Sequence, residues 1–262
     1  MKKRAFAVAA HPDDIEFLMA GTLILLGQAG YELHYMTVAN GSCGTAHLAR
    51  DEIVRIRREE SQRAAASIGA VFHESLVDDL AVFYEKETLA RLAAVMRQVA
   101  PEIVLTHSPV DYMEDHQNTA RLAATAAFSR GMPNFPTIPP APAVSQEVTV
   151  YHAQPHGSMD PLRRLVYPDL FVNVTSVVAR KRAMLAHHHS QKVWLDETQG
   201  MESYLITMED ISRRVGSLSG RFEYAEGWRR RLHYGFCAED ADPLAAALPE
   251  HVLVEAACKG AE

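Results

Sequence analysis

The chain has 262 residues, of which 48% are hydrophobic and 23% charged, so it is long enough for one large domain with a substantial core. Its net charge of −7 disfavours a general nucleic-acid-binding protein, because such proteins are usually basic. Its three cysteines lie far apart and form no C-x-x-C pair, which favours neither a disulfide framework nor a zinc ribbon and makes a reducing cytoplasm the expected setting.

Strands and helices alternate along the first half of the chain. The apolar run Arg4–Ala10 predicts a buried strand, and it is too short for the apolar core of a signal peptide. The predicted elements that follow it are a helix over Phe17–Ala29, a strand over Glu32–Ala39, a helix over Arg50–Ile68, a strand over Val71–Val77, a helix over Glu87–Val99, a strand over Ile103–His107 and a helix over Asp115–Phe128. The longest apolar segment, Phe17–Ala29, is too short to cross a bilayer, so no membrane span is predicted. We therefore expect an α/β fold, with a Rossmann-like doubly wound and mainly parallel sheet flanked by helices.

The second half of the chain is less regular. Residues 131–143 are rich in proline and predict an irregular excursion. The elements expected after it are strands over Val148–His152 and Leu170–Val174 and helices over Ser176–His188 and Met208–Leu218, the last capped by Thr207. From about residue 238 the chain is acidic and then rich in Ala and Leu, and we expect a C-terminal extension of a single domain that covers residues 1–262.

Polar segments follow the predicted strands at the points where those strands end. They are HPDD after the first strand, NGSCGT after the second, VDD after the third and SPVDYMEDH after the fourth. In parallel sheets the carboxyl ends of the strands meet at one edge, where ligands bind. The sequence therefore predicts a functional site at this edge.

The HPDD turn carries residue types that bind metals. His11 and Asp14 are three residues apart across a turn, so both can face one ion, and imidazole and carboxylate are ordinary zinc ligands. Asp13 between them would lie close enough to take a proton from a water molecule. The best third ligand is His116, with His107 as the next choice. Two histidines and a carboxylate suit Zn²⁺ and also mononuclear Fe²⁺, while the plain alternative is that these aspartates only cap a helix.

Further segments along the chain match those of a known family in the same order. They are A-H-P-D-D-x-E at residues 10–16, R-x-x-E at 57–60 ahead of a small-residue run and Ile68-Gly69, Val77-Asp78 after the third strand, and Lys181 with H-x-S-Q, represented here by His188-His189-Ser190-Gln191. Over roughly residues 4–195 the chain thus resembles the LmbE-like, or PIG-L-like, metal-dependent N-deacetylases.

The resemblance implies a function and a set of residue roles. The chain would be a single LmbE-like deacetylase domain that removes an acetyl group from an N-acetylglucosamine-type conjugate, a small-molecule partner. Zn²⁺ held by His11, Asp14 and His116 would activate a water molecule, with Asp13 as general base and then general acid. Arg57 would contact substrate oxygens, although the plain alternative for it is an ion-paired surface. Members of this family are often homo-oligomers, hexamers among them, and a homo-oligomer is one expectation here.

One position departs from the family pattern. Met113 stands where the family usually has a further histidine, and a thioether cannot donate a hydrogen bond. Tyr112 and His188 are the candidates to replace it. This departure leaves open a degenerate member that binds a sugar conjugate without turnover, and the ligand types leave open a different mononuclear Fe²⁺ enzyme.

Several other side chains have plain explanations on sequence alone. His152 and His156 could line the mouth of the pocket and contact substrate, but the favoured interpretation is that they are plain polar surface residues of a loop. Cys43 is expected to be incidental because no paired base can be assigned to it. Either Asp78 or Asp79 could brace a ligating histidine by a hydrogen bond.

Overall fold

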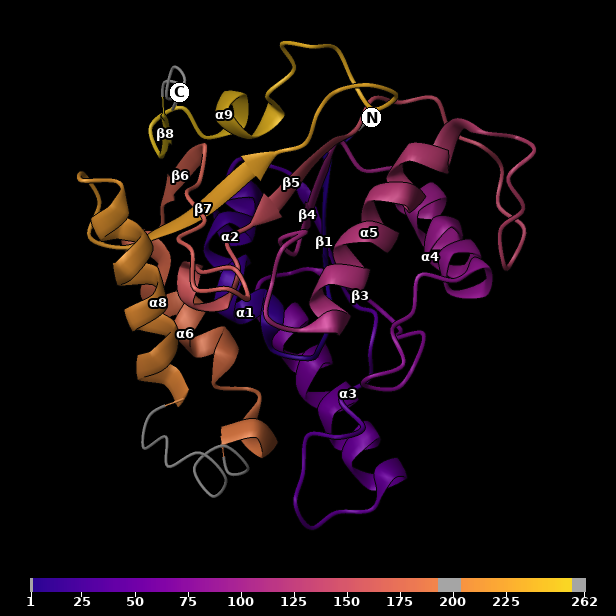
Figure 1. The fold of residues 1–262 in the computed structure, drawn as a ribbon, viewed down its shortest axis with the longest axis horizontal. Helices are drawn as coiled ribbons and strands as arrows, with labels where there is room; N and C mark the ends of the chain where they lie inside the picture. Colours follow the sequence, from indigo (N-terminus) through magenta and orange to yellow (C-terminus); the bar gives the residue numbers. More distant parts are fainter. Residues whose placement is uncertain (1, 193–203, 256–262) are drawn as a thin grey trace.

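One eight-stranded sheet organises the chain in the computed structural model, which describes residues 2–192 and 204–255 (Figure 1). The strands lie in the order β3-β2-β1-β4-β5-β7-β6-β8. Their bounds are β1 Arg4–Ala9, β2 Glu32–Thr37, β3 Val71–His73, β4 Ile103–Thr106, β5 Thr149–Ala153, β6 Leu170–Asn173, β7 Ala225–Arg230 and β8 Val252–Val254. β1 to β5 pair in parallel, whereas β7 pairs antiparallel with β5 and β6, and β8 antiparallel with β6. The expected α/β fold with a mainly parallel sheet is therefore confirmed.

Helices cover both faces of this sheet. They are α1 Asp14–Leu18, α2 Ala20–Gln28, α3 Arg50–Ser67, α4 Lys86–Val99, α5 Glu114–Phe128, α6 Val178–Leu185, α8 Tyr204–Leu218 and α9 Pro243–Ala247. In Figure 1, α4 and α5 lie on one side of the sheet and α6 and α8 on the other. No helix in the described ranges is long and apolar enough to cross a membrane.

The central strand β1 shows how the sequence builds the two core layers. Because side chains alternate along a strand, Ala5, Ala7 and Ala9 face the layer formed with α1, α2, α6 and α8. Phe6 and Val8 face the opposite layer, which contains α4 and α5. Both faces of β1 are buried, which explains its continuous apolar run.

A buried ion pair ties the C-terminal half of the fold to its N-terminal half. The Lys181 ammonium donates to Glu226 Oε1 at 2.6 Å, and both side chains are inaccessible or nearly so. The Glu226 carboxylate also accepts the backbone N–H groups of Gly21 and Thr22 at 2.8 and 2.7 Å. β7, α6 and α2 are thereby held together by one carboxylate.

Some boundaries differ from the sequence-based expectations. The helix expected over Phe17–Ala29 is two helices, because Met19 leaves the helical conformation at φ −135°. Thr207 lies inside α8 and does not cap it. α6 ends at Leu185, so His188 lies beyond that helix. β7, α9 and β8 were not predicted, and the last strand places residues from the expected C-terminal extension in the sheet.

Candidate metal centre and active site

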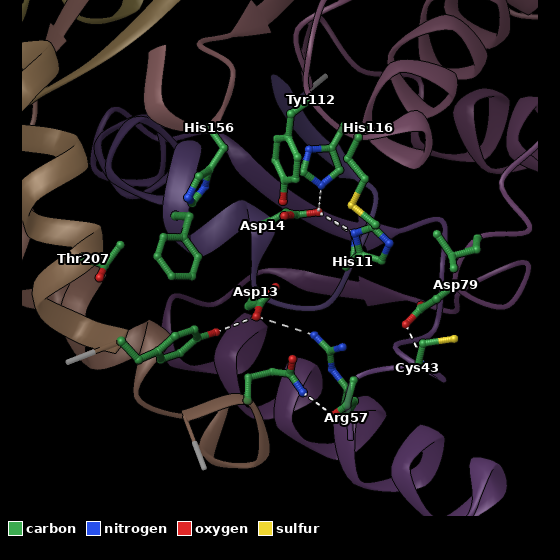
Figure 2. A pocket seen from close by; sticks show the side chains of 16 residues that line it. His11, Asp13, Asp14, Cys43, Arg57, Asp79, Tyr112, His116, His156 and Thr207 are labelled. Atoms are coloured by element: carbon green, nitrogen blue, oxygen red, sulfur yellow. Dashed lines mark hydrogen bonds and ion pairs between the residues drawn. The ribbon is translucent and has the colours of Figure 1, made fainter. Parts of the chain in front are cut away.

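A cavity of about 300 Å³ lies where the carboxyl ends of β1 and β4 meet (Figure 2). Its walls come from the HPDD turn, the loop after β2, the segment Asp79–Leu80, residues 112–116, His156 and the side chains of Gln191 and α8. The polar segments after the first four predicted strands thus do converge on one edge, as the parallel topology requires.

The HPDD turn is wound so that His11 and Asp14 face the same point. Asp14 N–H donates to the His11 carbonyl at 3.2 Å, and His11 N–H donates back to Asp14 Oδ2 at 2.7 Å. Asp13 between them has φ 107°, in the left-handed region that costs a residue with a Cβ about 1–3 kcal/mol. The fold holds this strained turn in place, which is common at functional sites.

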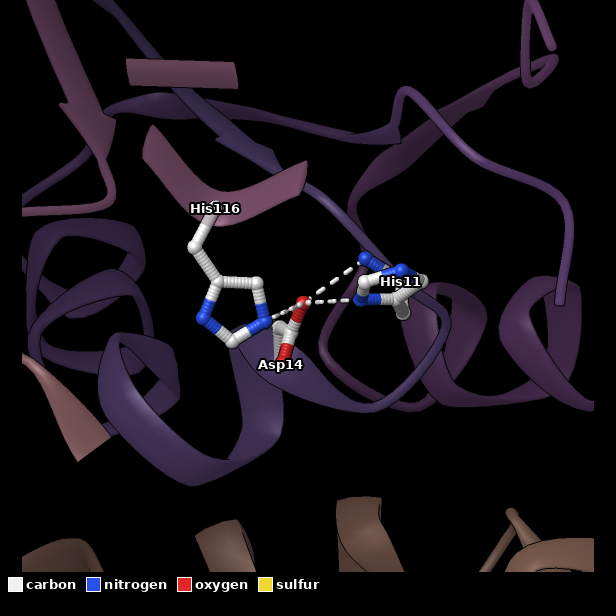
Figure 3. Close-up of side chains that lie close together, drawn as sticks. All are labelled: His11, Asp14 and His116. Carbon is white, nitrogen blue, oxygen red and sulfur yellow. Dashed lines mark hydrogen bonds and ion pairs between the residues drawn. The ribbon is translucent and has the colours of Figure 1, made fainter. Parts of the chain in front are cut away.

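The three predicted metal ligands lie close together (Figure 3). Asp14 Oδ2 is 3.3 Å from His11 Nδ1 and 3.4 Å from His116 Nε2, and one donor atom from each residue lies within 4.8 Å of the others. Two ligand atoms of a tetrahedral zinc ion, each about 2.0–2.1 Å from the metal, lie about 3.3–3.4 Å apart. The observed spacing and donor types therefore fit a divalent ion such as zinc.

Each of the two histidines has its second ring nitrogen on a carboxylate. His11 Nε2 is 3.0 Å from Asp115 Oδ2, and His116 Nδ1 is 3.0 Å from Asp111 Oδ1. Such carboxylate partners fix the tautomer and orientation of metal-ligating histidines. Sequence reasoning did not assign these roles to Asp111 and Asp115 but offered Asp78 and Asp79, which instead bind Arg50 and backbone amides of the loop after β2.

His107, the alternative third ligand, also faces Asp14, with its Nε2 3.2 Å from Asp14 Oδ2. Its Nε2 accepts the Ala10 N–H at 2.9 Å, and its ring stacks on that of His116 with centroids 4.1 Å apart. His107, Asp111 and His116 form a second buried group with metal-ligand spacing. Because its Nε2 lone pair is already used, His107 is better suited to support His116 than to join the first group.

Electrostatics keep the Asp14 carboxylate charged. Burial alone would raise the pKa of Asp14, but the adjacent His116 and His107 imidazoles lower it well below its ordinary value. A carboxylate that stays ionised is ready to bind a cation.

Asp13 has different surroundings from Asp14, although the two are adjacent in sequence. Burial raises the pKa of Asp13 above its ordinary value, and the Arg57 guanidinium 3.5 Å away opposes that shift. The Tyr204 hydroxyl donates to Asp13 Oδ2 at 2.6 Å. Tyr204 reaches the site from α8, and nothing in the sequence pattern indicated it. The result is a carboxylate held in place and more basic than usual, beside the candidate metal ligands.

Of the three predicted substrate residues, Arg57 and Tyr112 line the cavity and His188 does not. Arg57 is buried and lines the cavity, where its Nη2 donates to the Pro12 carbonyl. Tyr112 lines the cavity, is 62% exposed and packs edge-on against the His116 ring. His188 is fully buried with Nε2 3.1 Å from Glu16 Oε1 and does not line the cavity, so its position does not reach a substrate. Met113 does line the cavity, as does Cys43.

Comparisons with known proteins show what the chain is similar to. Residues 6–127 match the PIG-L family, described as GlcNAc-PI de-N-acetylase. The chain is 30% identical to a 4-oxalmesaconate hydratase of Pseudomonas putida over 86% of this chain and 88% of that protein. It is 28% identical to a diacetylchitobiose deacetylase of Thermococcus kodakarensis over 87% of this chain and 82% of that protein. The solved structure of the 4-carboxy-2-hydroxymuconate hydratase of Pseudomonas putida matches with a TM-score of 0.73 at 26% identity, covering 87% of this chain and 95% of that one.

Proposed function

Because this chain belongs to the PIG-L family, described as GlcNAc-PI de-N-acetylase, we propose that it is a zinc-dependent hydrolase that removes the N-acetyl group from an N-acetylglucosamine-type conjugate. The observation that carries this proposal is the grouping of His11, Asp14 and His116 with Asp13 beside them. An ion held by these three ligands would polarise the amide carbonyl and make a water molecule more acidic.

Asp13 is the residue best placed to move protons in this reaction. Its raised pKa makes it a stronger base than an ordinary carboxylate, and Tyr204 and Arg57 fix its orientation. We expect Asp13 to take a proton from the attacking water and then to deliver it to the departing nitrogen. Water oxygen is thereby bonded to the acetyl carbon, the C–N bond breaks, and acetate and the free amine are released.

The charge of the cavity favours a neutral substrate. Among the described lining residues, the formally charged ones are Asp13, Asp14, Asp79 and Arg57, three anions and one cation. A divalent ion would bring this balance to zero, so nothing in the wall attracts a polyanion. A cavity of about 300 Å³ suits one sugar ring with its acetamido group, with Arg57 and Tyr112 as contacts to its oxygens.

A second candidate function is the hydration of an unsaturated carboxylate. The 30% identity to a 4-oxalmesaconate hydratase supports it. Met113 in place of the family histidine departs from the deacetylase pattern. Asp13 and the bound ion would then catalyse the addition of water to a C=C bond and not the hydrolysis of an amide. It is the weaker candidate, because even with a divalent ion the cavity wall has no net positive charge to attract a substrate with several carboxylates.

The deciding experiment combines metal analysis with two activity assays. Purified protein is analysed for zinc and iron, then tested for free amine on a panel of N-acetylglucosaminides and for consumption of 4-oxalmesaconate. One zinc per chain with amine release supports the proposal. Consumption of 4-oxalmesaconate without amine release favours the hydratase, iron favours a different metal enzyme, and zinc without turnover in either assay favours a binding protein.

The variant Asp13→Asn tests the proton-transfer role. We expect amine release to fall by about 10²–10⁴-fold, since that is what a general base contributes, while zinc content is retained. Asp51→Asn is the matched control, because the Asp51 side chain is 90% exposed, pairs with Arg50 and does not line the cavity. Full activity of zinc-loaded Asp13→Asn would show that the general base lies elsewhere.

A further inference from the structure

The missing family histidine leaves a gap in the reaction site that another side chain must fill. When water attacks an amide, negative charge develops on the carbonyl oxygen, and hydrogen-bond donors aimed at that oxygen lower the barrier. Met113 lines the cavity but has no such donor. A replacement donor would have to be a polar hydrogen in the cavity wall that has no other hydrogen-bond partner.

Most donors in the wall have partners. Arg57 donates to the Pro12 carbonyl, Tyr204 to Asp13, and Gln191 to the Gly44 carbonyl at 2.9 Å. Within the described part of the chain, no hydrogen bond is formed by the rings of Tyr112 or His156. The Tyr112 hydroxyl is the group assigned above, with Arg57, to the oxygens of the sugar ring, which leaves the His156 ring for the carbonyl oxygen.

His156 differs from the other non-ligating histidines around the site. His107, His152 and His188 are at most 4% exposed and do not line the cavity. His156 lines the cavity and is open to solvent, so a substrate can reach its ring. Of the two sequence-based alternatives for His156, a place at the mouth of the pocket fits its position, and plain loop surface does not.

The fold fixes the direction in which His156 points. It lies three residues after the end of β5, at the same sheet edge as His107 after β4, because β4 and β5 are parallel neighbours. It opens a short turn in which Gly157 and Ser158 have φ 74° and 59°, and the left-handed conformation of the buried Ser158 is strained. Its ring packs against Phe17 and Tyr112, with centroids 5.8 and 6.0 Å apart. Figure 2 shows it beside Tyr112 and across the cavity from Arg57.

We propose that His156 is a catalytic residue that donates an imidazole N–H to the carbonyl oxygen of the substrate amide, in place of the family histidine absent at Met113. This inference rests on the proposed deacetylation and assigns a residue to it. The cavity walls lower the pKa of His156 below its ordinary value, so the ring is neutral near pH 7 and carries one N–H. As the water oxygen bonds to the carbonyl carbon, the C=O π electron pair moves onto the carbonyl oxygen. The His156 N–H donates a hydrogen bond to this negatively charged oxygen until the C–N bond breaks and the C=O bond re-forms.

Two substitutions at this position separate packing from hydrogen bonding. His156→Phe keeps a ring against Phe17 and Tyr112 but removes the donor, and we expect kcat to fall by about 10²–10³-fold with KM changed little. His156→Gln keeps an N–H donor and should retain more activity than His156→Phe. His251→Gln, in the turn before β8, is the control and should match the wild type. Zinc content should be the same in all four proteins.

A rescue variant tests whether the two positions do the same task. Adding Met113→His to the His156→Phe variant should raise kcat at least tenfold above that of His156→Phe alone. A His156→Phe variant whose kcat stays within threefold of the wild type would overturn the proposal. So would equal loss in His156→Gln and His156→Phe, because that would indicate packing and not donation.

Binding of methylphosphonate supplies a readout that does not depend on turnover. Its tetrahedral, negatively charged oxygens resemble the oxygen that His156 is proposed to bind. Calorimetry of the zinc-loaded proteins should show at least about tenfold weaker binding to His156→Phe than to the wild type. Equal affinity, or no measurable binding by either protein, would overturn this inference. Weaker binding without amine release by the wild type would instead count against the proposed deacetylation alone.

Discussion

At the scale of single residues, the two carboxylates behind the histidines are the most informative feature of the site. Asp115 and Asp111 each lie 3.0 Å from the outward ring nitrogen of His11 and His116. Asp115 also accepts the Leu80 N–H at 2.7 Å, which anchors it to the neighbouring loop. The orientation of the proposed ligands is thus set by residues that would not themselves touch the metal.

Replacing either carboxylate should weaken metal binding without removing a ligand. We expect Asp111→Asn and Asp115→Asn each to raise the zinc dissociation constant by about 10–100-fold, because the histidines lose basicity and a fixed tautomer. Competition with a chelator of known affinity measures this directly. Asp78→Asn is the control, since Asp78 binds Asn40 and Arg50 and no histidine. Unchanged affinity in Asp111→Asn and Asp115→Asn would mean that the histidines are held by packing alone.

The residues of the site were predictable to different degrees. His11, Asp13 and Asp14 could be named because they are adjacent in the chain at the end of an apolar strand. Tyr204 could not, because it lies 191 residues from Asp13 and meets it only through the packing of α8. The environment of His188 was not predictable either, since its sequence position does not reveal that its ring turns inward to Glu16.

At the scale of secondary-structure elements, β7 shows what a sequence pattern misses. Its sequence AEGWRR contains a carboxylate, a glycine and two arginines, so it lacks the apolar alternation of a strand. It becomes a strand because β5 and β6 pair with it on both sides. Gly227 has no room for a Cβ, which would lie 2.7 Å from the Gln154 side chain. β1, in contrast, was predictable because both of its faces are buried and its sequence is apolar throughout.

The buried ion pair that joins β7 to α6 should be essential for stability. Lys181→Met would leave the Glu226 carboxylate buried without its cation, and we expect unfolding free energy to fall by about 3–5 kcal/mol. Arg182→Met is the adjacent control, because Arg182 pairs with Glu209 with about half of its side chain exposed, and its loss should cost less than about 1 kcal/mol. Denaturant unfolding of the three proteins measures both values. Similar midpoints for Lys181→Met and the wild type would contradict a stabilising role for the pair.

At the scale of the whole molecule, the family and the sheet were predictable because their signals are ordered along the chain. Alternating elements predicted a parallel sheet, and the structure confirms it for β1 to β5. The motif segments predicted a PIG-L relative, and the comparisons confirm that family. The antiparallel end of the sheet was not predictable, because β7 and β8 depend on neighbours far away in sequence. His156 follows β5, which borders that end through β7, and Tyr204 begins α8, which leads into β7.

Global stability should fall in acid because His152 is buried as a neutral ring. Its Nδ1 lies 2.8 Å from the His107 carbonyl and its Nε2 3.2 Å from Arg231, an arrangement that needs one N–H and one lone pair. Burial lowers the pKa of His152 from 6.5 to about 4. Between these values the unfolded chain binds a proton that the folded chain does not, so stability rises with pH and is lost as pH falls from 6.5 towards 4.

The variant His152→Gln isolates this contribution from all other titrating groups. A glutamine amide can replace both hydrogen bonds but does not titrate, so its unfolding free energy should fall less steeply in acid than that of the wild type. The difference between the two should grow by up to about 1.4 kcal/mol per pH unit and reach about 3 kcal/mol near pH 4. Urea unfolding of metal-free proteins between pH 7.5 and 4, with metal removed to avoid acid release, measures it. Parallel curves for the two proteins would mean that His152 takes up its proton without unfolding the chain.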